Sequence, residues 1–244
     1  MNKLAYLSQI NLLTELSAAD LAAIDALVPS ASYPPHTVIY EPGNRLEHLY
    51  FLKRGRVQLY QLTPDGRQFT LAILGDGNIF GEIDTFATGA GSCYAETMSP
   101  TLVCSMTRAD LIRFMLRRPQ VALKLVEILS RHIRSLHELT ATLALDDVRS
   151  RVLHLLLKLA QQFGQPSEDG WTRLDLRLTH QDVAHLVGAT RETVSTALAG
   201  LSRQQAVRTR HGTIDVNPGR ATALVASEAQ PNLTDRPRQG GETA

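Results

Sequence analysis

The spacing of the apolar residues changes near Thr107. From Tyr33 to Met106, short runs in which apolar and polar residues alternate are separated by turn signals, such as the Thr-Pro-Asp-Gly sequence at 63–66. Regular short strands of this kind are typical of a β-sandwich or jelly roll. After Thr107 the spacing becomes helical, with a short helix over Asp110–Leu116 and a longer one that begins near Pro119. The sequence therefore predicts an α+β protein in which a β-roll precedes the helices.

The composition excludes several classes of protein. Hydrophobic residues make up 43% and charged residues 20% of the 244-residue chain, which is normal for a globular protein. Cys93 and Cys104 are too few for a disulfide framework or a four-thiolate metal site. No apolar run approaches the ~18 residues of a membrane span. The first 13 residues interrupt their apolar positions with polar ones and make a poor signal peptide. We therefore expect a cytoplasmic protein that does not contact a membrane.

The long helix repeats its apolar positions at alternating steps of four and three. The pattern comprises Ala122, Val126, Leu129, Ile133, Leu136, Thr140 and Leu143. Such steps form a heptad seam, which packs either on the β-roll of the same chain or on the same helix of a second copy. The polar residues beside the seam, including Arg131, Arg134 and Glu138, favour the second alternative. We expect a two-chain coiled coil and hence a homodimer.

Residues 179–201 have the spacing of two short helices that cross at a sharp turn. Thr179 is a helix cap with Asp182 three residues later, and Gly188 supplies the backbone freedom that a sharp turn requires. Thr190 then caps a second helix, and the small Ala184 stands where the two helices must approach closely. This combination predicts a helix-turn-helix whose second helix enters a DNA major groove. An ordinary helical hairpin with a solvated surface is the alternative.

The exposed face of the second helix carries side chains that suit base recognition, namely Arg191, Glu192, Ser195 and Thr196. An arginine donates to two acceptors of guanine, and a glutamate accepts from the amino group of cytosine. Farther along, a basic stretch that contains Arg208, Arg210 and His211 predicts a β-hairpin. This hairpin is either a wing that contacts DNA phosphates or a simple solvated hairpin. The expected partner is double-stranded DNA.

The order of elements and two motifs together resemble the cyclic-AMP receptor and fumarate-nitrate regulator (CRP/FNR) family of bacterial transcription factors. The motifs are Phe-Gly-Glu-Ile at 80–83 and Gly-Ala-Thr-Arg-Glu-Thr-Val at 188–194, and the resemblance covers about residues 10–217. It implies a homodimer, an effector pocket in each β-roll, RNA polymerase as a partner and a pseudo-palindromic operator similar to TGTGA. The expected domains are a β-roll at 1–118, a dimerisation helix at 119–145, a winged helix-turn-helix at 146–217 and a disordered tail at 218–244.

The resemblance also implies particular site residues. Arg191 and Glu192 match two base-reading positions of the family, and a third, commonly arginine, falls on Thr196. Contacts to DNA phosphates fall on Thr179, Gln181, Thr190 and His211. The effector pocket falls on Gly81, Glu82, Gly91, Ser92, Leu136 and His137.

The implied pocket departs from the family in a way that argues against cyclic AMP. Cyclic-nucleotide binders of the family hold the cyclic phosphate with an Arg-Ser pair, whereas residues 89–93 read Gly-Ala-Gly-Ser-Cys, without the arginine. Losing this charge-assisted contact costs about 1.5–3 kcal/mol, roughly a factor of ten to more than a hundred in affinity. We expect a regulator that works without cyclic AMP and without a cofactor, with another small effector left open. A nucleotide-dependent regulator with a divergent pocket is the alternative.

A metalloenzyme with a cupin-like β-roll is a more remote alternative. Such a site requires histidine and carboxylate ligands at facing strand positions. The histidines do not show a pair at this spacing with a supporting carboxylate; they are His36, His48, His132, His137, His154, His180, His185 and His211. We therefore expect neither a metal site nor an enzyme.

Overall fold

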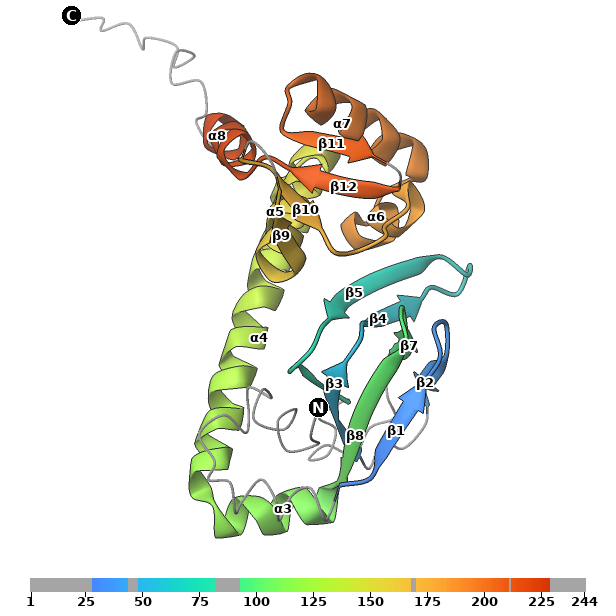
Figure 1. Ribbon diagram of the computed structural model, residues 1–244, viewed down its shortest axis with the longest axis vertical. Helices are drawn as coiled ribbons and strands as arrows, with labels where there is room; N and C mark the ends of the chain where they lie inside the picture. The colour runs from blue at the N-terminus through green and yellow to red at the C-terminus, as the bar shows by residue number, and fades with distance from the viewer. Residues whose placement is uncertain (1–27, 44–47, 82–92, 168–169, 211, 229–244) are drawn as a thin grey trace, which may run out of the picture. The chain divides into compact units, whose positions relative to one another are not determined.

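The computed structural model describes residues 28–43, 48–81, 93–167, 170–210 and 212–228. The chain divides into two compact units, Met1–Thr140 and Ala141–Ala244 (Figure 1). Within the described ranges, no helix is both long and apolar enough to cross a membrane. The same residues contain no group of three histidine, cysteine, aspartate or glutamate side chains that could hold a metal ion.

The first unit contains two antiparallel four-stranded sheets. In the order of hydrogen-bonded neighbours, one consists of β1 (Ser30–Tyr33), β8 (Thr101–Thr107), β3 (His48–Arg54) and β6 (Ile79–Phe80). The other consists of β2 (Val38–Tyr40), β7 (Tyr94–Thr97), β4 (Val57–Leu62) and β5 (Gln68–Leu74). The turn from β3 to β4 requires Gly55, which has φ +109° and whose added Cβ would lie 2.6 Å from the Pro100 carbonyl oxygen.

Two apolar cores stabilise this unit. The first includes residues of both sheets, among them Leu52, Val57, Phe80, Ala95 and Val103. The second covers the other face of β3 and β8 with helix α3 (Arg108–Arg117) and the first turns of helix α4 (Pro119–Leu145). Cys93 and Cys104 are both buried free thiols. The sheets therefore form the expected β-roll, with helices on one side.

Helix α4 has two distinct apolar faces. The face that is buried against the β-roll consists of Val121, Leu125 and Ile128. Three residues of the predicted seam, Val126, Ile133 and Leu136, are 59%, 53% and 56% exposed. Another seam residue, Leu129, packs partly against the β-roll core. Most of the apolar seam therefore faces away from the β-roll of its own chain.

The second unit combines several helices with a small antiparallel sheet. The helices are α5 (Val148–Phe163), α6 (His180–Val187), α7 (Arg191–Arg203) and α8 (Pro218–Glu228). The strands lie in the order β11 (Val207–Arg210), β12 (Thr213–Val216), β10 (Thr172–Leu174) and β9 (Gly164–Pro166). Helix α5 packs against α6, α7 and α8. The predicted α+β class is confirmed.

One sequence prediction for this unit needs correction. The expected tail at 218–244 begins with helix α8, because the Asn217 side chain caps it through the Arg220 N–H at 3.1 Å and Ala221 is buried. Residues 229–244 lie outside the described residues. Strand β10 ends at Leu174, and Leu176 and Leu178 beyond it are also buried.

Candidate DNA-binding site

Helix α6 begins with a complete capping box. The Thr179 hydroxyl accepts from the Asp182 N–H at 3.1 Å, and the Thr179 N–H donates to the Asp182 carboxylate at 2.7 Å. The side chains that anchor the helix are Val183, Ala184, Leu186 and Val187, all of them buried. The predicted start of this helix is therefore fixed by local hydrogen bonds and by one apolar face.

The turn between α6 and α7 has a left-handed residue at its start. Gly188 has φ 63° and ψ 47°, a conformation that glycine adopts at little cost. Arg151 of α5 donates to the Val187 carbonyl at 2.8 Å and so satisfies the end of α6. Thr190 then caps α7 by accepting from the Thr193 N–H at 3.3 Å. These contacts produce the short turn of a helix-turn-helix.

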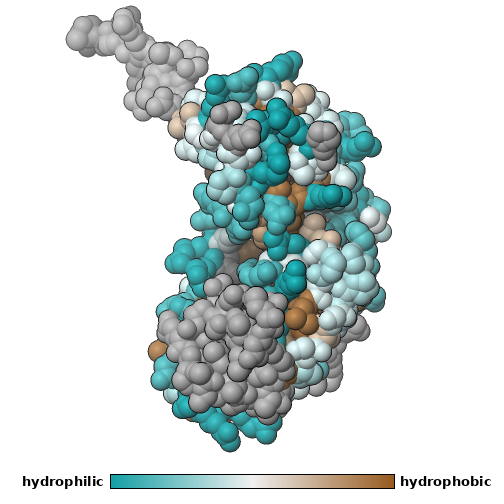
Figure 2. Space-filling view, viewed as in Figure 1, coloured by the Kyte–Doolittle hydropathy of each residue, from teal (hydrophilic) through white to brown (hydrophobic). Residues whose placement is uncertain are grey.

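Helix α7 is held by one face and exposed on the other. Its buried face consists of Val194, Ala197, Leu198 and Leu201, and the helix packs against α5 and α6. Arg191, Glu192 and Thr196 are exposed, as predicted. In the view of Figure 2, the surface of this unit is mainly hydrophilic. An arginine and a glutamate are therefore displayed on the first turn of a helix that is anchored by its opposite face.

Ser195 differs from the other three predicted base-reading residues because it is only half-exposed. Its hydroxyl donates to the Arg191 carbonyl at 2.8 Å and lies 2.8 Å from Nδ1 of His180. Sequence reasoning did not assign a role to His180. The contact joins α6 to α7 and depends on how the two helices cross, so no local pattern could have indicated it.

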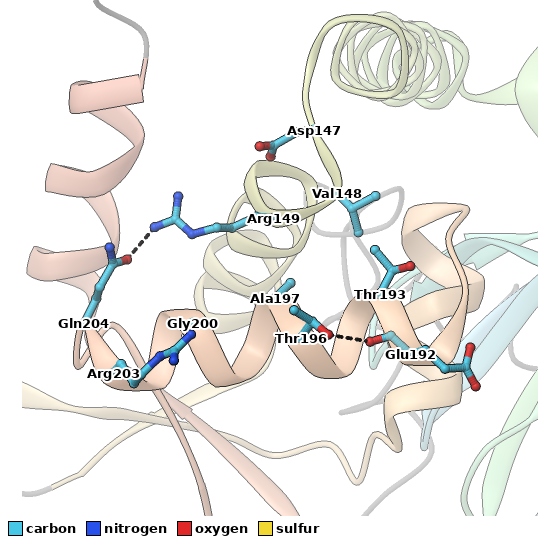
Figure 3. Close-up of a pocket in the computed structure, with 10 residues that line it drawn as sticks. All are labelled: Asp147, Val148, Arg149, Glu192, Thr193, Thr196, Ala197, Gly200, Arg203 and Gln204. Carbon is cyan, nitrogen blue, oxygen red and sulfur yellow. Dashed lines mark hydrogen bonds between the residues drawn. The ribbon is translucent and has the colours of Figure 1, made fainter.

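A hollow lies beside α7, opposite the N-terminus of α5 (Figure 3). Its lining includes Asp147, Val148 and Arg149 of the α5 start and, from the α7 side, Glu192, Thr193, Thr196, Ala197, Gly200, Arg203 and Gln204. Arg149 donates to the Gln204 side chain across this hollow. Glu192 lies at one end of the hollow and Arg203 near the other. The exposed face of α7 therefore continues into a groove whose wall includes two arginines.

The β11–β12 hairpin contains the predicted basic residues, but it uses them differently. Arg210 is exposed. Arg208 donates to the Asp215 carboxylate at 2.9 Å and stacks on the Trp171 ring, with Cζ 4.3 Å from the ring centre. The predicted phosphate contact of Arg208 would compete with this hydrogen bond and this stacking, which already engage its guanidinium. His211 lies outside the described residues.

Asp215 is a buried acidic residue of the sheet that the sequence did not reveal as an ion-pair centre. Its side chain is 0% exposed and accepts from Arg173 at 3.0 Å as well as from Arg208. Burial raises the pKa of Asp215, but the hydrogen bonds and positive charges of the two arginines outweigh burial and leave the pKa below its usual value. The three residues come from three neighbouring strands, so this cluster fixes the hairpin to β10.

The predicted effector pocket is only partly described. Gly81, with φ +107°, has no room for a side chain, because a Cβ would lie 2.8 Å from the His48 carbonyl oxygen. Leu136 and His137 are exposed on α4. Glu82, Gly91 and Ser92 lie outside the described residues. Beside Gly81, the rings of Tyr50 and Phe80 stack at 5.2 Å and help to fill the space between the two sheets.

Two family descriptions match this chain. The cyclic nucleotide-binding domain matches residues 30–118, and the Crp-like helix-turn-helix domain matches residues 150–218. The "CRP-like cAMP-activated global transcriptional regulator" of Mycobacterium tuberculosis is 34% identical over 77% of this chain and 84% of its own length. The "Global nitrogen regulator" of Synechococcus elongatus is 33% identical over 69% of this chain and 77% of its own length.

Solved structures agree with these matches in fold. FixK2 of Bradyrhizobium japonicum has a TM-score of 0.70 and 26% identity, and it covers 81% of this chain and 96% of its own. The c-di-GMP-responsive global regulator CLP of Xanthomonas campestris has a TM-score of 0.71 and 22% identity, with 82% and 99% covered.

Fold and site thus define a transcription regulator with a helix-turn-helix DNA-binding domain. The chain belongs to the CRP/FNR family. The predicted resemblance is confirmed. The relatives are regulators of transcription, so the prediction that the chain is not an enzyme is confirmed as well.

Proposed function

We propose that this protein is a sequence-specific transcription regulator that binds a pseudo-palindromic, TGTGA-like operator as a homodimer and contacts RNA polymerase. The observation that supports DNA reading most strongly is the first turn of α7. There Arg191 and Glu192 are exposed, while the opposite face of the helix is buried in the unit. A two-fold dimer would present two such helices about 34 Å apart, one turn of the duplex.

Each exposed side chain has a distinct proposed role in base recognition. Arg191 donates to the two major-groove acceptors of a guanine, and Glu192 accepts from a cytosine amino group. Thr196 offers one short hydroxyl, which already donates to the Glu192 carbonyl at 3.1 Å. The base pair that faces Thr196 is therefore read less strictly than the pair that faces Arg191.

The proposed phosphate contacts surround the starts of the two helices. Thr179, Gln181 and Thr190 are exposed at the N-termini of α6 and α7. Unpaired N–H groups and the positive end of the helix dipole favour an anion at such positions. Arg210 and His211 supply further phosphate contacts from the hairpin. Such contacts orient the protein without carrying sequence information.

The apolar seam of α4 supports the proposed homodimer. Val126, Ile133 and Leu136 are each more than half exposed in the single chain, although the same helix buries a separate apolar face against the β-roll. A coiled coil with a second copy would remove this exposed seam from water. We accordingly assign 1–118 to the β-roll, 119–145 to the dimerisation helix and 146–217 to the DNA-binding domain.

We also propose that DNA binding does not require cyclic AMP. Residues 89–93, where the resemblance places the phosphate contacts, contain no cationic side chain to hold a cyclic phosphate. The core between the sheets includes the apolar side chains of Ile39, Leu59 and Leu71 together with the rings of Tyr40 and Tyr50. This donor set does not fit a cyclic nucleotide well. A different small effector is compatible with this proposal. A nucleotide-dependent regulator is the second candidate function.

Selection of bound DNA from a random pool, with and without cyclic AMP, tests this function. We expect an inverted repeat with a G·C pair in each half-site, and the same repeat at similar enrichment in both arms. Enrichment of no sequence would contradict the proposed DNA reading. Enrichment only in the presence of cyclic AMP would contradict the proposed independence and establish the second candidate.

A further inference from the structure

We propose that His180 is a positioning residue that sets the base preference of α7 by holding the Ser195 hydroxyl. The inference rests on the proposed function and names a further residue of the same site. His180 is the first residue of α6, and Ser195 lies in the second turn of α7. Nδ1 of His180 and Oγ of Ser195 are 2.8 Å apart, and the Ser195 hydroxyl donates to the Arg191 carbonyl at 2.8 Å.

The direction of these hydrogen bonds follows from the number of protons available. A serine hydroxyl has one hydrogen, and a carbonyl oxygen only accepts. Since the Ser195 hydrogen is directed to the Arg191 carbonyl, its oxygen must accept from His180. Nδ1 of His180 therefore carries a proton. The neutral ring with this tautomer and the charged ring both have that proton, so the bond does not depend on the charge of His180.

The hydrogen bonds form a directional chain from α6 to the residue that reads guanine. His180 donates to Ser195, and Ser195 donates to the carbonyl of Arg191. The other contacts that hold α7 against the unit are mainly apolar, through Val194, Ala197, Leu198 and Leu201. Apolar packing is non-directional, so it tolerates a small rotation of the helix about its axis. A directional bond near the first turn restricts that rotation.

The N-terminus of α6 is itself held by hydrogen bonds, so the position of His180 is fixed. The capping box of Thr179 and Asp182 brackets it, with the Thr179 hydroxyl also donating to the Asp182 carboxylate at 2.7 Å. On this arrangement Ser195 does not touch a base. Its role is to transmit the position of α6 to α7.

Four variants of the full chain test the proposal: His180→Phe, His180→Asn, Ser195→Ala and the double variant His180→Phe/Ser195→Ala. Phenylalanine keeps a ring without the donor, whereas asparagine places an N–H close to the position of Nδ1. Each variant is titrated with the operator found by selection and with every single-base change in one half-site. Thermal unfolding, followed by Trp171 fluorescence, reports whether each variant is folded.

We expect His180→Phe and Ser195→Ala each to lower affinity for the preferred operator about three- to tenfold, the range of one hydrogen bond, and to flatten the preference at the pair that faces Arg191. The double variant should be no weaker than either single one, because both break the same chain. His180→Asn should bind the preferred operator within about twofold of the wild-type affinity.

Other results would overturn the proposal. Additive losses in the double variant, or a loss that is equal on all sequences, would show that His180 and Ser195 act separately or only on phosphates. If His180→Asn is folded but binds the operator as weakly as His180→Phe, a role for the Nδ1 donor is excluded. If His180→Phe does not fold, the preference profiles of Ser195→Ala and His180→Asn decide the question. A wild-type protein without any base preference would refute the proposed function itself, a distinct outcome.

Discussion

Replacing Asp215 with alanine removes the anion that two arginines share in the C-terminal sheet. Removing one partner of a buried ion pair costs about 3–5 kcal/mol, because the remaining charge is left uncompensated. Here the carboxylate is 0% exposed, but the Arg173 and Arg208 side chains are 49% and 24% exposed and recover some hydration. We therefore expect the free energy of unfolding of the second unit to fall by about 2–4 kcal/mol.

The assay uses Trp171, the only tryptophan of the chain, whose ring is covered by Arg208. Urea unfolding followed by its fluorescence reports the unit that contains Asp215. Asp215→Asn is the matched variant, because it keeps the shape and one acceptor but places a donor opposite one guanidinium. We expect it to lose about half as much stability as Asp215→Ala, roughly 1–2 kcal/mol.

The pH dependence adds a second check with a definite sign. The pKa of Asp215 is lower in the folded protein than in the unfolded chain, where it is about 3.9. The carboxylate therefore stabilises the fold above that value, and its contribution disappears as the pH falls through the lower, folded pKa. The stability difference between wild type and Asp215→Asn should shrink below about pH 4. A variant as stable as the wild type at pH 7, or a difference that does not change with acid, would refute this reasoning.

Three further predictions concern assembly, effector and hairpin. The double variant Val126→Asp/Ile133→Asp should be a monomer in sedimentation. The control Leu123→Asp, which is exposed on the same helix but outside the seam, should stay dimeric. A dimeric double variant would exclude the seam as the dimer interface. Saturating cyclic AMP should change operator affinity less than about threefold, ~0.65 kcal/mol, in a fluorescence anisotropy titration, and a much larger change would show that other groups hold the phosphate. Arg210→Ala should weaken binding to all sequences about equally and reduce the salt dependence of affinity, while a change in base preference would reassign Arg210 to base reading.

Local signals explain how much of this protein the sequence could predict. The caps at Thr179 and Thr190 and the left-handed Gly188 are decided within a few residues, so the two helices and their turn follow from the sequence. The heptad seam and the alternating strands are likewise periodic over short windows. These features indicated the order of the elements.

The features that could not be predicted depend on contacts between distant residues. From the sequence alone, Arg208 is expected to be a surface cation. The pairing of β11 with β12 places Asp215 beside it, and the pairing of β12 with β10 places Arg173 on the same carboxylate. Ser195 is likewise expected to be exposed, but the crossing of α6 and α7 places His180 Nδ1 2.8 Å from its Oγ. Helix α8 has no strong apolar period, and it forms where Ala221 is buried. In each case tertiary packing decides the role of the side chain.

The central claim is that the first turn of α7 reads the operator, and one substitution tests it most directly. Arg191→Ala and its control Arg203→Ala, an exposed arginine at the other end of the same helix, are measured on every single-base variant of one half-site. Arg191→Ala should cost about 1–3 kcal/mol on the preferred operator and flatten the preference for one guanine. Arg203→Ala should leave that preference unchanged. If Arg191→Ala weakens binding equally on all variants while every base preference survives, then α7 does not read the operator through Arg191.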